Sequence, residues 1–295
     1  MEWEKKEIRD EKGVGLSVLQ HEDLIMPTFF EHMEAEKRLK MIREFKHRKG
    51  DILLCSYPKT GTHWLSNLVY FLVTPGPVQS LKTVPPKLMD LIPLDRWEEV
   101  EKSRILSSHF KINRQPIEHL EQGGKVIVIT RDPRDAMVSM KYHVQNDERL
   151  SNAPVSWNFF FDTWMNGKCP FGSYFDYYNS WEKAMKENKN LNVLIVHFEN
   201  LKNNGLKELQ RIQDFLEVSN SEERLKEILD RCTVKKMKED IDTGKVVSSL
   251  KDKDGKSFLY RKGEIGDWKN HFTVAQSEFF DNVLEEKFKD SIFKL

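Results

Sequence analysis

The segment SYPKTGTHWL (56–65) lies between two apolar runs and carries residue types that suit the binding of an anion. Lys59 supplies a positive charge, and the hydroxyls of Thr60 and Thr62 add hydrogen-bond donors. Gly61 lets the backbone approach a ligand where a strand is expected to pass into a helix, whose first N–H groups attract anions. The segment predicts a loop that holds phosphate or sulfate without a metal, with a plain turn as an equal alternative. It departs from the standard phosphate-loop pattern GxxxxGKS/T, because its lysine comes early.

A second cationic segment, RKGEIGDWKNHF (261–272), places Arg261 and Lys262 next to a glycine. Arginine can bind a phosphate through two hydrogen bonds, and glycine exposes backbone N–H groups. The segment lacks the period of a helix or a strand, so it is compatible with a turn that orders over a ligand. Taken alone, it favours a solvated loop.

The composition argues against several classes of partner. The 295 residues include 47 Lys and Arg and 47 Asp and Glu, so no overall positive field favours nucleic acid or an anionic membrane. The N-terminal segment MEWEKKEIRDEKGVG (1–15) lacks the apolar core of a signal peptide, and no apolar run is long enough to span a bilayer. We therefore expect a cytoplasmic protein that binds neither nucleic acid nor membrane and keeps its cysteines reduced.

Four short apolar runs predict the buried strands of a parallel sheet: DILLCSY (51–57), RILSSHF (104–110), KVIVITR (125–131) and NVLIVHF (192–198). Helical patterns follow, including SEERLKEILDRC (221–232) behind a serine cap and TVAQSEFFDNVLEEKF (273–288), which opens with Thr273 and Gln276 at capping-box spacing. The alternation predicts an α/β fold, with one domain over residues 1–295. A mainly parallel sheet should carry helices on both faces, with the phosphate-loop-like segment after its first strand.

The carboxyl ends of parallel strands meet at one edge of a sheet, where such folds bind ligands. The four runs lead into Lys59, His109, Arg131 and either His197 or Phe198. We therefore expect these side chains to converge on one site. Histidine can act as a general base near neutral pH. When His109 is considered without the surrounding motifs, however, the favoured interpretation is a structural histidine that is hydrogen-bonded in the core.

Three motifs, YPKTGTHW (57–64), RDPRDAMVS (131–139) and RKGEIGDWK (261–269), resemble in order and distance the signature regions of the cytosolic sulfotransferase family. The resemblance runs from about residue 50 to KNHFTVAQSE (269–278) and is weakest over residues 1–50, an N-terminal segment on the acceptor side. It implies transfer of a sulfuryl group from 3′-phosphoadenosine 5′-phosphosulfate to a hydroxyl or amine of a small acceptor.

The resemblance also implies a role for each matching residue. The 5′-phosphosulfate is expected on the first loop, adenine beside a tryptophan, and the 3′-phosphate on the second and third motifs, with His109 as the base. The expected phosphosulfate residues are Lys59, Thr60, Gly61 and Thr62; the adenine residues are Trp64, Phe198, Cys232 and Val234; and the 3′-phosphate residues are Arg131, Ser139, Arg261, Lys262 and Gly263. His63 is expected to be a further phosphate donor, with an exposed ring that has no role as the alternative.

Sulfuryl transfer suits these residue types. Its transition state is loose and in line, so the protein must align the reactants and stabilise charge. Lys59 would neutralise charge on the leaving phosphate oxygen, and His109 would take the acceptor's proton. A sulfonate carries less charge than a phosphoryl group, and the sequence offers no obvious carboxylate set, so no metal is expected.

Several positions depart from the family pattern. Ser107 stands where a lysine is common, Phe198 replaces a tyrosine, CTVKKM (232–237) replaces Thr-Ser-Phe, and His63 replaces a small hydroxyl residue. These departures keep open a nucleotide-binding pseudoenzyme or sensor. A small-molecule kinase is a third hypothesis, but it leaves RKGEIGDWK (261–269) unexplained and lacks a GKS/T element.

The resemblance extends to a small homodimer interface of the form KxxxTVxxxE, which matches Lys269, Thr273, Val274 and Glu278. A short segment with one charge at each end can pair antiparallel with its own copy around a two-fold axis. The alternative is a helix start with ordinary exposed charges.

The acceptor pocket is expected to be lined by aromatic side chains, so we expect a phenol or another small aromatic alcohol. We interpret Asp147 and Glu148 as charged residues of a solvated loop. A buried carboxylate at this place would instead pair with a cationic group and favour a phenolic amine as the acceptor. The candidate pocket residues are Phe29, Phe30, Ser107, Tyr142, Asp147 and members of SWNFFFDTW (156–164).

Overall fold

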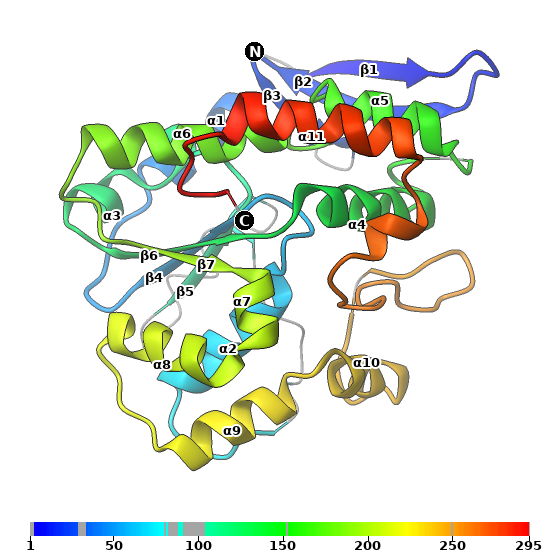
Figure 1. Cartoon of the computed structure of the whole chain (residues 1–295). Coiled ribbons are helices and arrows are strands. Elements are labelled where there is room, and N and C mark those ends of the chain that lie inside the picture. The colour runs from blue at the N-terminus through cyan, green and yellow to red at the C-terminus, as the bar shows by residue number, and fades with distance from the viewer. Residues whose placement is uncertain are drawn as a thin grey trace.

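A computed structural model describes residues 3–28, 34–79, 81, 88–90, 104–151, 153–248 and 250–294. Its central sheet contains β4 (Ile52–Ser56), β5 (Ile105–Ser108), β6 (Lys125–Thr130) and β7 (Val193–His197), in the order β5-β4-β6-β7. All three strand pairings are parallel, as predicted from the four apolar runs. The carboxyl ends of the strands therefore lie at one edge, and the first and second motifs follow β4 and β6 there (Figure 1).

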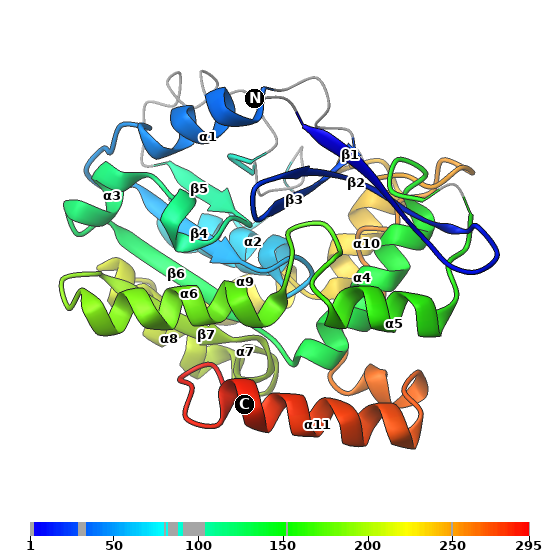
Figure 2. The same cartoon turned by 90° about the horizontal axis from the view of Figure 1, so that it is seen from above.

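Alternate residues of the strands face two apolar layers, as expected for a sheet covered on both sides. Leu53 and Val126 belong to the core beneath α4 (Pro133–Asn146), α5 (Trp157–Met165), α6 (Tyr174–Glu187) and α11 (Val274–Phe288). Leu54 and Ile127 belong to the opposite core, built with α2 (Thr62–Val73), α7 (Phe198–Asn203), α8 (Gly205–Leu216) and α9 (Glu222–Arg231). Figures 1 and 2 show the resulting arrangement, and the predicted α/β fold is confirmed.

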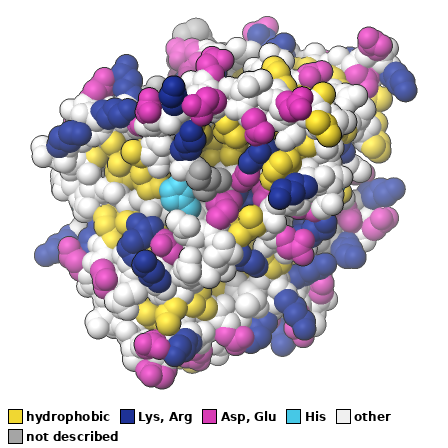
Figure 3. All heavy atoms as spheres, viewed as in Figure 1, with side chains coloured by type: hydrophobic (Ala, Val, Ile, Leu, Met, Phe, Trp, Pro, Cys, Tyr) yellow, Lys and Arg dark blue, Asp and Glu magenta, His cyan; other side chains and the backbone are white. Residues whose placement is uncertain are grey.

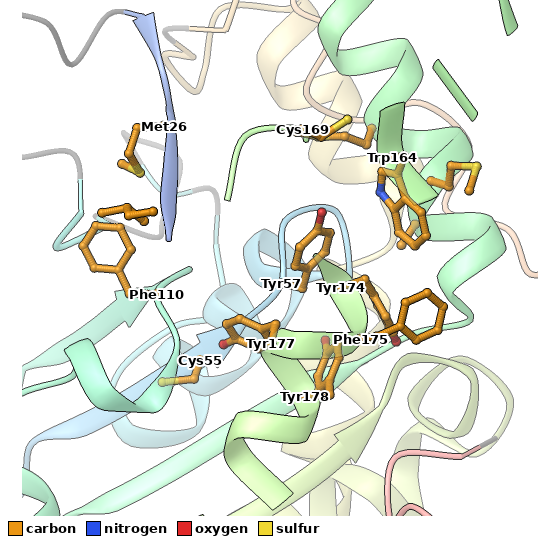
Figure 4. Close-up of a cluster of buried hydrophobic side chains, with 14 of the residues drawn as sticks. Met26, Cys55, Tyr57, Phe110, Trp164, Cys169, Tyr174, Phe175, Tyr177 and Tyr178 are labelled. Atoms are coloured by element: carbon orange, nitrogen blue, oxygen red, sulfur yellow. The ribbon is translucent and has the colours of Figure 1, made fainter. Parts of the chain in front are cut away.

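Buried tyrosines hold the chain next to the strand ends. The hydroxyl of Tyr57 donates to the carbonyl of Gly172 (2.8 Å), and that of Tyr174 donates to the carbonyl of Arg131 (2.6 Å). Such bonds each contribute on the order of 1 kcal/mol and leave little freedom to the loops they hold. Figure 4 shows the cluster to which they belong, with Tyr57, Trp164, Tyr174, Tyr177 and Tyr178 gathered together.

The N-terminal segment forms an antiparallel sheet that we did not predict. It contains β1 (Glu4–Arg9), β2 (Gly15–His21) and β3 (Leu24–Pro27), and it precedes α1 (Ala35–Arg43). The side chains of β1 are charged and largely exposed, so its sequence does not resemble that of a buried strand. Leu19 of β2 and Met26 of β3, by contrast, belong to the main core. The phosphate-loop-like segment thus follows the first strand of the parallel sheet, which is the fourth strand along the chain. The division at residue 50 stays a prediction.

The predicted helix starts are present. Ser221 caps α9, and Thr273 and Gln276 form a reciprocal capping box at the start of α11. The remaining elements are α3 (Ile117–Glu121), α10 (Val234–Asp242) and two 3₁₀ turns, Ile112–Arg114 and Asp267–Asn270. Among the described residues, no helix combines the length and apolar character needed to cross a membrane.

Candidate active site

A cavity of about 570 Å³ opens at the carboxyl ends of the parallel strands. A volume of this size is ordinary for a site that takes small molecules. All three motifs contribute to its wall. The predicted residues that line it are Lys59, Gly61, Thr62, His63, Trp64, His109, Arg131, Ser139, Tyr142, Asp147, Phe198, Val234, Arg261, Lys262 and Gly263.

The first motif presents the start of α2 to the cavity. Gly61 precedes the helix with φ 112°, in the left-handed region, and a Cβ there would lie 2.9 Å from a ring carbon of Phe198. Glycine is therefore required on both conformational and steric grounds. Gly61, as the N-cap residue, has no side chain that could cap the first N–H groups of α2, so an anion can accept hydrogen bonds from them.

Lys59 lies among like charges. Burial in the cavity, together with repulsion from Arg131 and Arg261, lowers the pKa of its ammonium to about 8. On the face shown in Figure 3, acidic and basic side chains are mixed, so this concentration of cations is a local feature. Three cations that repel one another around a cavity favour an anionic ligand.

Arg131 connects the motifs. Its Nη1 donates to the carbonyl of Lys59 (3.3 Å) and its Nη2 to the carbonyl of Glu264 (2.8 Å). Its guanidinium also lies 4.4 Å from the ring centre of Phe198. The two predicted anion-binding loops are thus held against each other by one side chain.

The third motif is held in a fixed turn. Asp267 accepts hydrogen bonds from Arg261 and from Lys262 (2.6 Å), and Arg261 stacks 4.2 Å above the ring of Tyr142. Gly263 has φ 64°, and a Cβ there would lie 2.4 Å from Val234. This segment is therefore an ordered part of the cavity wall, and not the freely solvated loop that the sequence favours when it is taken alone.

His109 is held as a neutral imidazole. Its Nδ1 lies 2.8 Å from the carbonyl oxygen of Ser56, which can only accept, so Nδ1 carries the proton and Nε2 keeps its lone pair. Burial, with a smaller contribution from the charge of Lys59, lowers the pKa of the imidazole to about 4, although the bond to Ser56 opposes the shift. The backbone N–H of His109 donates to the buried carboxylate of Asp90, which also accepts from the hydroxyl of Ser108 (2.7 Å).

Three predicted residues lie behind the cavity wall. The hydroxyl of Thr60 donates to the carbonyl of Tyr57 (2.7 Å), and Ser107 is fully buried within β5. Cys232 lines a separate, much smaller pocket. We predicted that these three side chains contact a ligand directly. Their positions behind the wall do not support that prediction.

The acceptor side differs in part from our expectation. Phe160, Phe161 and Trp164 of SWNFFFDTW (156–164) belong to the apolar core, and no residue of that segment lines the cavity. Phe29 and Phe30 lie outside the described residues. The aromatic wall that sequence reasoning missed is formed by Phe171 and Phe258.

Asp147 is buried, so our interpretation of it as a solvated loop charge is wrong, whereas Glu148 is exposed as expected. Arg149 donates to both carboxylate oxygens of Asp147, from Nε (2.7 Å) and from Nη2 (2.6 Å). The carboxylate lines the cavity but already has a cationic partner. Its capacity to bind an acceptor amine is correspondingly reduced.

The predicted dimer segment lies at the surface. Val274 is 76% exposed, and Thr273 serves as the cap of α11. Lys269 lies 5.8 Å from the ring centre of Trp268. The exposure of Val274 permits an interface, and the dimer stays a prediction.

Among the described residues, one group combines metal-ligand types: His47, Asp51 and His119. Asp51 directly precedes β4, so the group lies at the amino end of that strand, away from the cavity. Asp51 already accepts hydrogen bonds from Arg104 and from the N–H of Arg48, and the two Nδ1 atoms of the histidines lie 3.0 Å apart. The group is thus paired internally, and the expected absence of a metal from the reaction stays a prediction.

Comparison with known proteins gives a consistent result. The profile of the sulfotransferase domain family matches residues 49–292. Human sulfotransferase 2A1 is 33% identical over 277 residues, which cover 92% of this chain and 95% of that protein. Human sulfotransferase 1C2 is 32% identical over 260 residues, which cover 83% of this chain and 86% of that protein.

Solved structures agree. The crystal structure of mouse sulfotransferase SULT7A1 complexed with PAP superposes with a TM-score of 0.74 at 26% identity, covering 93% of this chain and 96% of that one. Retinol dehydratase, solved with androsterone and the inactive cofactor PAP, superposes with a TM-score of 0.73 at 19% identity. The superposition covers 100% of this chain and 98% of the dehydratase chain, and at this identity it supports the fold alone. The matches confirm the resemblance seen in the three motifs: the chain belongs to the sulfotransferase family.

Proposed function

We propose that this protein transfers a sulfuryl group from 3′-phosphoadenosine 5′-phosphosulfate to the hydroxyl of a small, largely apolar acceptor. The observation that carries the proposal is the single cavity that joins an uncapped helix start, the cations Lys59, Arg131 and Arg261, and a neutral histidine, His109. An anionic donor suits the first two features, and a hydroxyl that must lose a proton suits the third.

The donor nucleotide fits the residues present. The mouse relative was solved with PAP, which is 3′-phosphoadenosine 5′-phosphate. The cavity of this protein has aromatic side chains that could contact an adenine ring and cationic side chains that could contact phosphate groups. We assign the 5′ end to Lys59 and the start of α2, the base to Trp64 and Phe198, and the 3′-phosphate to Arg131, Ser139 and Arg261. Trp64 and Phe198 already lie edge to face with their ring centres 5.2 Å apart.

The donor supplies an activated sulfur and a stable phosphate leaving group. The acceptor oxygen forms a bond to sulfur while the bond from sulfur to the phosphate oxygen breaks, and the hydroxyl proton passes to Nε2 of His109. Nε2 can accept it because Nδ1 keeps its own proton on the carbonyl of Ser56. Lys59 stabilises the charge that grows on the leaving oxygen.

The acceptor is a phenol or a related aromatic alcohol. Phe171, Phe258, Met140 and Leu150 supply apolar wall, and the ring of Phe171 lies 5.1 Å from that of His109, edge to face. A flat apolar body suits such walls and leaves its hydroxyl for the histidine. A phenolic amine receives less support, because Arg149 already pairs with Asp147.

Turnover tests this proposal directly. With the sulfuryl donor and a panel of phenols, alcohols and amines, we expect sulfated product, and we expect His109→Ala and His109→Gln to lower the rate by ~10²–10⁴-fold while PAP affinity stays nearly unchanged. Near-normal turnover in both variants would remove His109 from the reaction. Binding of PAP without turnover on any acceptor would instead favour the pseudoenzyme hypothesis.

A further inference from the structure

One face of α4 runs along the cavity. Ser139, Tyr142, His143 and Asn146 line it at the spacing i, i+3, i+4 and i+7, which places them on one side of a helix. Each residue of a helix advances about 1.5 Å, so His143 lies about 6 Å along the axis from Ser139. Sequence reasoning assigned Ser139 to the nucleotide and gave His143 no role.

The imidazole of His143 has open hydrogen-bonding capacity. Its Nδ1 is buried and has no hydrogen-bond partner among the described residues. Its Nε2 lies 4.0 Å from a carboxylate oxygen of Asp147, beyond hydrogen-bond distance. A polar atom buried without a partner costs roughly 1–3 kcal/mol, so an acceptor group that forms a hydrogen bond with Nδ1 gains affinity from that bond.

His143 is neutral, as His109 is. Burial lowers its pKa well below the ordinary value, and Lys59 and Arg149 lower it further. A neutral imidazole offers one donor and one acceptor. It therefore suits a neutral oxygen group, hydroxyl or carbonyl, and offers no charge to a carboxylate or an ammonium group.

The surroundings of His143 favour the same chemistry. The ring of Phe258 lies 5.2 Å away, edge to face, and Met140 and Leu150 also line the cavity. Asp147 and Arg149 neutralise each other. An acceptor bound here would contact apolar side chains and one neutral side chain that can form hydrogen bonds, that of His143.

We propose that His143 is a specificity-determining residue that binds a second, uncharged oxygen group on the acceptor while the reacting hydroxyl lies at His109. The proposal rests on the proposed function and narrows its substrate class to apolar aromatic acceptors with two oxygen groups. The two histidines come from different walls, His109 from the end of β5 and His143 from α4, so each can hold one end of such a molecule.

Matched acceptors test the inference. We would compare 4-alkylphenols with the corresponding ω-hydroxyalkyl phenols, with side chains of two to four carbons, because the methylene groups insulate the phenol from the second hydroxyl. For at least one length, wild type should show a kcat/KM about tenfold higher for the hydroxylated member, as expected when a buried polar group gains its partner.

Substitutions assign that preference to one side chain. His143→Phe should bring the ratio to about one, and His143→Gln, which keeps a donor and an acceptor, should retain part of it. Lys141→Gln, on the same helix but outside the cavity wall, should leave the ratio at its wild-type value. The thermal shift on adding PAP checks that each variant is folded and binds nucleotide.

The outcomes separate the two proposals. Wild type that neither binds PAP nor sulfates any phenol refutes the proposed function. Sulfation with the same ratio in wild type, His143→Phe and His143→Gln refutes only the role of His143. Loss of transfer to the simple alkylphenols in both His143 variants, with PAP binding intact, would make His143 part of proton transfer and would also overturn the inference.

Discussion

The carboxylate of Asp135, on α4, accepts a hydrogen bond of 2.7 Å from the backbone N–H of Gly266. Its other oxygen accepts from the N–H of Trp268 (2.9 Å), and the side chain is almost fully buried. The second motif therefore holds the third motif in place. The order of the cationic turn at Arg261 depends on an acid that lies well before it in the sequence.

Asp135→Asn should weaken PAP binding about tenfold. The amide group has a single acceptor oxygen, so one of the two buried N–H groups loses its partner, which costs roughly 1–3 kcal/mol. Calorimetric titration measures the affinity. Asp281→Asn is the matched control. Asp281 lies exposed on α11, where it forms an ion pair with Arg134 of α4, so its substitution should alter PAP affinity little. Equal affinities in wild type and Asp135→Asn would show that the anchor does not position the site.

Arg261→Ala should distinguish PAP from AMP. Only PAP has the 3′-phosphate that we assign to Arg261, and a hydrogen bond to a charged group contributes about 1.5–3 kcal/mol. PAP affinity should therefore fall about 10- to 150-fold, and AMP affinity should fall much less. Lys269→Ala, in the same segment but outside the cavity wall, is the control. Equal losses for the two nucleotides would remove Arg261 from the 3′-phosphate.

The residues that sequence reasoning placed correctly are those tied to the ends of parallel strands. Lys59, His109 and Arg131 each follow an apolar run, and parallel pairing carries their loops to one edge of the sheet. The resemblance added Arg261, which is distant in sequence. Its approach to the site depends on tertiary bonds such as that from Gly266 to Asp135, which no local pattern reveals.

The residues that sequence reasoning misplaced depend on which side of a helix faces the cavity. Phe160 and Phe161 look like a pocket wall in the sequence, but α5 turns them into the core. Phe171 and His143 line the cavity although neither belongs to a recognisable motif. The β1 strand was missed because its sequence, EKKEIR, is charged and largely exposed and so lacks the apolar run from which the other strands were predicted.

Lys59 should take up a proton when nucleotide binds. Its pKa of about 8 means that roughly half of the side chains are neutral at pH 8 in the free protein, and a nearby phosphate raises the pKa. Calorimetry in buffers of different ionisation enthalpy should show uptake of up to about half a proton per PAP at pH 8, and much less at pH 6.5.

Lys59→Arg is the control for this experiment, because arginine stays charged at both pH values. The proton uptake at pH 8 should be absent in that variant. The same uptake in both proteins would assign the titration to another group.

Asp90 should make stability depend on pH in a characteristic direction. Burial raises the pKa of its carboxyl from 3.8 to about 7, although bonds from Ser108 and His109 oppose the shift. The folded state then binds the proton more tightly than the unfolded state, so Asp90 contributes stability at low pH that is lost as pH rises to about 7. The free energy of unfolding of wild type, relative to Asp90→Asn, should therefore fall between pH 5 and 7.

Asp23 provides a control of opposite sign. The hydrogen bond from Arg114 lowers the pKa of Asp23 to about 2, so its contribution changes only below about pH 4. Over pH 5–8, urea denaturation should show a constant difference between wild type and Asp23→Asn. A constant difference for Asp90→Asn as well would contradict the raised pKa of Asp90.

The segment at the start of α11 gives the prediction for assembly. Val274 is 76% exposed within the segment from Lys269 to Glu278, and Phe279, which directly follows it on the same helix, is 51% exposed, so an apolar surface is available there. Pairing of this segment with its own copy around a two-fold axis would bring each lysine near a glutamate. Such a patch buries less than ~1,000 Å², so the dimer should be weak enough for one substitution to break it.

Val274→Glu should therefore convert a wild-type dimer to a monomer at micromolar concentration, as measured by analytical ultracentrifugation. The new carboxylates would meet each other across the axis, next to apolar surface that loses its cover. Val247→Glu is the matched control, since Val247 is 68% exposed elsewhere on the surface and its variant should remain a dimer. Activity should change little in either variant, because neither valine lines the cavity. A monomeric wild type at this concentration would refute the proposed interface.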